Sequence, residues 1–130
     1  MSDDMIALAR RAVACRGWRW MPGAATNSKF ARVVAADAEG VPCAAEVGAT
    51  QDDCHAVWLD GVPLLPDLTD PATLGCVLAL VREVWGQDDL VAFRFDGQWC
   101  AEVTPQEGQH HAFYGSSEAE ALVAALESAP

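Results

Sequence analysis

The chain has no apolar run of the roughly 20 residues that are needed to span a bilayer, so we expect no membrane partner. It also lacks the basic start of a secretory signal, since it opens Met-Ser-Asp-Asp, and we expect a cytoplasmic protein. Internal repeats and low-complexity segments are absent. With 130 residues, 52% of them apolar, residues 1–130 are expected to form a single domain with one core.

The common catalytic and phosphate-binding motifs are missing as well. No G-x-G-x-x-G and no Walker A loop is present to cradle a phosphate. The stretch Tyr114-Gly115-Ser116-Ser117 lacks the second glycine of a G-x-S-x-G nucleophile elbow. We therefore expect no cofactor, and we favour a protein that is not an enzyme.

Cysteine and histidine do not form a metal-binding pattern. The five cysteines include no C-x-x-C, and an odd count favours reduced thiols in a cytosol. No two histidines have the three- to five-residue spacing of a zinc site. Neighbours on a strand point to opposite faces, so neither Cys54-His55 nor His110-His111 chelates naturally, and no metal is expected. A small hydrolase built on Cys54, His110 or His111 is an alternative.

Basic residues are scarce outside the N-terminal quarter of the chain. Residues 1–32 hold six basic and two acidic residues, a net charge of +4. Residues 33–130 hold two basic and seventeen acidic residues, a net charge of −15. A body this acidic repels nucleic acid, so duplex DNA is not an expected partner. A local anion site near the N-terminus is compatible with this distribution.

The segment 65–86 carries the strongest structural signal of the chain. Asp70 is a good N-cap, Pro71 suits the first helical position, and Gly86 suits the left-handed C-cap. Apolar residues recur between them at helical spacing on more than one side, so we expect a core helix covered on most of its circumference. Gly75 in mid-helix indicates a close approach by another element.

Six strands and two further helices are predicted around this helix. Short turns such as Asp96-Gly97 favour antiparallel pairing, and Pro42 indicates an edge strand. Ser2 is the N-cap expected for the first helix, and Ser117 with Glu120 forms a capping box for the last. We predict an α+β domain, mainly an antiparallel sheet of about five to six strands with three helices, in the order α-β-β-β-α-β-β-β-α. The predicted strands are 30–35, 41–47, 55–59, 90–95, 98–104 and 109–114.

A cluster of arginine and tryptophan near the N-terminus is the candidate ligand site. Guanidinium groups can neutralise a phosphate, and two indole rings can stack on a base. Alternatively, Trp18 and Trp20 plug the core and the arginines pair with the acidic body, which is the commoner outcome for such a pattern. An exposed tryptophan pair would favour the ligand. The candidate ligand-binding residues are Arg10, Arg11, Arg16, Trp18, Arg19 and Trp20.

Three blocks of the chain resemble small phage and prophage proteins of GC-rich bacteria. They are Trp18-Arg19-Trp20-Met21-Pro22-Gly23, the block LPDLTDPATLGCVLALVREVWG at 65–86, and the block SEAEALVAAL at 117–126. That group has no established activity, so the resemblance transfers no site residue. It implies a small protein made in the cytoplasm of an infected host cell.

These observations lead to competing functional hypotheses. The first is a non-enzymatic, phage-type accessory protein that sequesters a small anionic, nucleotide-like ligand, which would suit counter-defence. The alternative is an acidic protein–protein inhibitor, in which the −15 of residues 33–130 faces a basic host surface. A virion component or the small hydrolase above are further alternatives, and a homo-oligomer is compatible with each.

Overall fold

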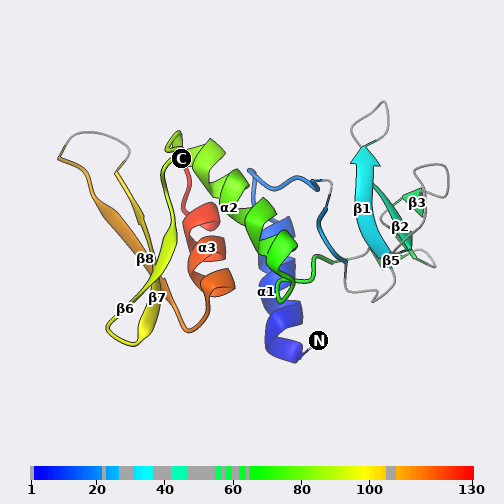
Figure 1. The fold of residues 1–130 in the computed structure, drawn as a ribbon, viewed down its shortest axis with the longest axis horizontal. Helices are drawn as coiled ribbons and strands as arrows, with labels where there is room; N and C mark the ends of the chain where they lie inside the picture. Colours follow the sequence, from blue (N-terminus) through cyan, green and yellow to red (C-terminus); the bar gives the residue numbers. More distant parts are fainter. Residues whose placement is uncertain are drawn as a thin grey trace.

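A computed structural model describes residues 2–21, 23–26, 65–104 and 108–130 in full, with the backbone of five strands between 31 and 63. Figure 1 shows three helices side by side, with the last three strands at one end of the view and the earlier strands at the other. The helices are α1 (Asp3–Val13), α2 (Pro71–Trp85) and α3 (Glu118–Glu127). The strands are β1 (Ala31–Ala36), β2 (Pro42–Glu46), β3 (His55–Ala56), β4 (Trp58–Leu59), β5 (Val62–Pro63), β6 (Ala92–Phe95), β7 (Gln98–Val103) and β8 (His111–Gly115).

The prediction of an α+β fold with three helices is confirmed, but the predicted sheet of five to six strands is wrong. The described strands form three separate antiparallel sheets, ordered β1-β2-β3, β4-β5 and β6-β7-β8. The predicted strand 55–59 divides into β3 and β4, and β4 pairs with β5 instead of extending the first sheet. Because α2 follows β5 in the chain, it separates the early strands from the hairpins of the last sheet.

Pro42 does not mark an edge strand, because β2 is the central strand of its sheet. Pro42 is the first residue of β2 and pairs with Ala36 of β1. The partners of β3 are the next two residues, Cys43 and Ala44. The missing proline N–H therefore lies outside the β2–β3 ladder, a position that a central strand tolerates.

The predicted helix starts are confirmed. The side chain of Ser2 accepts a bond from Met5 N, that of Asp70 from Thr73 N, and that of Ser117 from Glu120 N. These oxygens satisfy amides that have no partner within their helix. The capping box at Ser117 is only half formed, because the Glu120 carboxylate accepts from the Ser116 hydroxyl at 2.7 Å.

Helix α2 ends as expected but is covered on fewer sides than predicted. Gly86 adopts the left-handed conformation at φ 64° and closes the helix. Gly75 is exposed, and no atom lies within 4 Å of the place where its Cβ would be, so no close approach explains it. The side chains that α2 buries fully are Thr73, Val77, Leu80 and Val81.

The core lies between the helices and one face of the last sheet. Helix α3 contacts all three strands β6, β7 and β8 and also packs against α1 and α2. Ala101 and Val103 of β7 are fully buried against it, and Trp99 and Phe113 pack at the margin of the same core. The Trp85 indole at the end of α2 donates to the carbonyl of Ala125 at 2.8 Å. One face of the β6–β8 sheet is therefore committed to the core.

Candidate functional site

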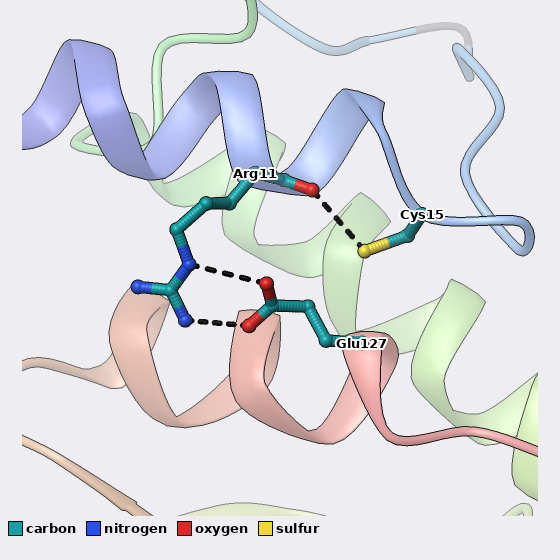
Figure 2. A network of polar contacts seen from close by, with 3 residues as sticks. All are labelled: Arg11, Cys15 and Glu127. Carbon is teal, nitrogen blue, oxygen red and sulfur yellow. Dashed lines mark hydrogen bonds and ion pairs between the residues drawn. The ribbon is translucent and has the colours of Figure 1, made fainter.

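Arg11, a predicted ligand residue, is held by a carboxylate at the far end of the chain. Its guanidinium donates two bonds to the Glu127 carboxylate, one from Nε to Oε2 at 3.2 Å (Figure 2). This hydrogen bonding raises the pKa of Arg11, and desolvation opposes the effect. The Cys15 thiol donates to the Arg11 carbonyl at 3.3 Å, and burial raises the pKa of that thiol. The guanidinium thus joins α1 to α3.

Of the other three arginines of the predicted site, one forms an ion pair and two form none with the described residues. Arg19 forms an ion pair with Glu83 of α2, and both side chains are about half exposed. Arg10 and Arg16 are exposed and, within the described residues, have no carboxylate partner. Carboxylates among the described residues therefore take two of the four predicted cations, Arg11 and Arg19.

Trp18 and Trp20 contact each other, but not in a geometry that could sandwich a base. Their ring centroids are 5.4 Å apart and their planes are inclined by 79°, an edge-to-face pair. Trp18 packs against the core, and its Nε1 is buried without a hydrogen-bond partner. The adjacent Gly17 allows this approach, since a Cβ there would lie 2.4 Å from Val84 Cγ1. The two rings therefore do not form a parallel pair that could hold a base between them.

A second candidate surface is the face of the β6–β8 sheet that points away from α3, which we call the outer face. Cross-strand register places Phe93, Cys100 and Tyr114 in one row and Phe95 with Gln98 in the next. Paired residues share a face, and their neighbours Trp99 and Ala101 point the other way. Among the described elements, no helix covers this face in Figure 1. The outer face comprises Val91, Phe93, Phe95, Gln98, Cys100, Glu102 and Tyr114.

The outer face collects the exposed large apolar side chains of the described residues. Phe95 is 60% exposed, and Tyr114 and Val91 are each 50% exposed. Cys100 lies at the centre of the face, yet is only 1% exposed because it is flanked by Phe93 and Tyr114. Burial raises the pKa of the Cys100 thiol, so the thiol is neutral and packs as a small apolar side chain between its two neighbours.

Four exposed carboxylates lie in β7 or in the connections at the two ends of β6. Asp88 and Asp89 are exposed just before β6, and Asp96 is exposed in the β6–β7 turn. Glu102 lies on the outer face itself, with the His110 imidazole 3.6 Å away. We call these four carboxylates the acidic rim.

The residues considered for a hydrolase are not brought together. Cys54 lies outside the described residues. His110 contacts Glu102 at the outer face, whereas the ring of His111 lies 5.9 Å from that of Trp85 on the core side. Across the described residues, no three His, Cys, Asp or Glu side chains gather where a metal ion could bind. None of the three described helices is long and apolar enough to cross a membrane.

Sequence reasoning missed the outer face, although a signal for it was present. The stretch Val91-Ala92-Phe93 at the start of β6 places apolar residues on both faces, which is the pattern of a strand buried on both sides. The helix that follows these strands in the chain, α3, packs on one of the two faces.

No protein-family model matches the chain, and neither a curated protein nor a solved structure matches it. Within the described residues, the candidate sites are therefore the N-terminal segment 10–20 and the outer face.

Proposed function

We propose that the protein is a non-enzymatic binding protein whose outer face docks onto a protein with an apolar centre and a basic rim. The observation that carries this proposal is the gathering of Phe95, Tyr114 and Val91, each at least half exposed, on one sheet face. Exposed apolar patches of this kind mark interaction sites, and aromatic side chains supply much of the energy at such sites.

The charge of the partner follows from the acidic rim. A basic surface would gain from the carboxylates of the rim and be steered toward them by the net charge of −11. A second copy of this chain would bring the same carboxylates against one another, which disfavours a symmetric dimer through the outer face. This proposal develops the alternative that the sequence suggests, an acidic protein–protein inhibitor.

Affinity capture from host lysate tests the proposal, with the Phe95→Ala/Tyr114→Ala double variant beside the natural chain. We expect a partner that binds at low salt, weakens as salt is raised, and is lost with the double variant. Trp20→Ala is the matched aromatic control and should retain the partner. Capture that is insensitive to the double variant would overturn the proposal, as would a dimer of the chain alone that the double variant dissociates.

A second candidate function is the capture of a small, nucleotide-like anion at the N-terminal segment. It is favoured by the exposed Arg10 and Arg16, which have no carboxylate partner among the described residues. Tryptophan fluorescence and melting temperature, measured across a nucleotide panel, test it. Quenching that the Arg10→Ala/Arg16→Ala variant abolishes and the Arg94→Ala control retains would support it. No response to any nucleotide would remove it. A phage origin and a role in counter-defence remain predictions.

A further inference from the structure

The β6–β7 turn holds a small pocket at one end of the outer face. Its volume is about 320 Å³, and it is lined by Phe95, Asp96, Gln98 and Tyr114. Because ligand pockets begin at about 300 Å³, this one suits a side chain or a comparably small group. Phe95 and Tyr114 present two of the most exposed large apolar side chains of the described residues.

The turn fixes the polar side of this pocket. Asp96 and Gly97 have φ of 52° and 79°, the left-handed pair of a two-residue hairpin turn. Phe95 pairs directly with Gln98 across the turn, and Asp96 lines the pocket together with both of them. A tight hairpin restricts this arrangement before any ligand arrives, which lowers the entropic cost of binding.

The lining chemistry is that of a cation site. Aromatic faces attract cations through their quadrupole, and a carboxylate adds a charge-assisted hydrogen bond. No basic side chain lines the pocket. The same sheet already shows such a contact on its other face, where the Arg94 guanidinium lies 5.8 Å from the Trp99 ring centroid. The Asp96 carboxylate would repel an anion, and an apolar group would form no hydrogen bond with it.

From this arrangement, we infer that the pocket receives an arginine side chain of the partner, with the guanidinium against Phe95 and Tyr114 and bonded to Asp96. The inference rests on the proposed function, because it names the group by which the basic partner enters the acidic rim. A planar guanidinium fits both requirements, since it stacks on rings and bonds carboxylates in a fork.

Titration of the full chain with N-acetyl-arginine amide, followed by NMR, tests the inference. Signals of Phe95, Asp96, Gln98 and Tyr114 should shift, while the neutral isostere N-acetyl-citrulline amide should leave them in place. Asp96→Asn should weaken binding by up to about fivefold, the upper end of what an exposed ion pair contributes. Asparagine tolerates the left-handed conformation, so the turn is retained. Asp89→Asn, on the rim but outside the pocket, is the matched control.

Equal shifts with citrulline, or none with arginine, would overturn the inference. Partner capture that still depends on Phe95 and Tyr114 would then leave the proposed function intact. Conversely, NMR shifts that only N-acetyl-arginine amide causes would support the arginine pocket. If no partner were captured in that case, the result would count against the proposed function.

Discussion

Gly115 and Gly75 differ in how much space surrounds them: Gly115 is crowded by α3, whereas Gly75, within α2, faces open space. A Cβ on Gly115 would lie 2.7 Å from the backbone nitrogen of Ala121, so the end of β8 is pressed against α3. A Cβ on Gly75 would meet nothing within 4 Å. The first glycine is required for packing, whereas the second only weakens its helix.

Gly115→Ala should therefore lower the free energy of unfolding by about 1–3 kcal/mol, the usual cost of overpacking. Gly75→Ala should raise it by up to about 1 kcal/mol, because alanine is the better helix former and the space is open. Urea unfolding of both variants measures the two changes. A stabilised Gly115→Ala protein would contradict the described contact between β8 and α3.

Cys100 provides a chemical probe of the outer face. Burial raises the pKa of its thiol and leaves it 1% exposed, so little reactive thiolate is present or accessible. We expect iodoacetamide at pH 8 to alkylate Cys100 about tenfold or more slowly in the folded protein than in urea. Tyr114→Ala should accelerate the folded-state reaction by uncovering the sulfur. Site-resolved mass spectrometry measures both rates, and equal rates in the folded and unfolded protein would refute this packing.

At the scale of elements, the start of α2 is tied to the segment before β1. The Asp70 carboxylate caps α2 and accepts a bond from the Thr73 hydroxyl at 3.0 Å. The same Thr73 oxygen accepts the amide of Ala25 at 2.8 Å. Thr73 is fully buried, so one hydroxyl links the N-terminal segment to the helix cap.

Thr73→Val should cost about 1–3 kcal/mol of stability, because it leaves the Ala25 amide without its partner. The matched control is Thr69→Val, whose exposed hydroxyl bonds only to Asp67 within the preceding turn. Thermal unfolding of the two variants tests the difference. If Thr69→Val lost as much stability as Thr73→Val, the buried hydrogen bonds of Thr73 would contribute no more than an exposed one.

The sequence predicted the helices because their signals are local. Ser2, Asp70 and Ser117 each act within one turn of their own helix, and Asp96-Gly97 fixes a hairpin by its own backbone. The single large sheet was wrong because strand pairing is not local. Nothing between 55 and 63 indicates in sequence that the chain divides into β3, β4 and β5.

In the candidate site, too, local contacts could be predicted from the sequence and long-range ones could not. The sequence identified Trp18 and Trp20 as neighbours, and they do contact each other. It could not show that Glu127 would take Arg11 or that Glu83 would take Arg19, because these partners lie 116 and 64 residues away. Whether residues 10–20 bind a ligand remains a prediction.

At the scale of the whole molecule, the exposed aromatic side chains and the acidic rim both belong to the last sheet and its connections. The helices and the inner face of the last sheet share one core, with α3 at its centre. The outer face carries the exposed aromatic side chains and Glu102, and the other carboxylates of the acidic rim lie in the connections at the two ends of β6. Docking through this face is therefore the proposed function, with residues 10–20 as the competing surface.

Hydroxyl-radical footprinting of the protein, free and bound to its captured partner, tests this claim most directly. Aromatic side chains on both surfaces are labelled in one experiment, so each surface serves as the control for the other. We predict that oxidation of Phe95 and Tyr114 falls on binding while that of Trp20 is unchanged. Protection of Trp20 with Phe95 and Tyr114 unaffected would contradict the account.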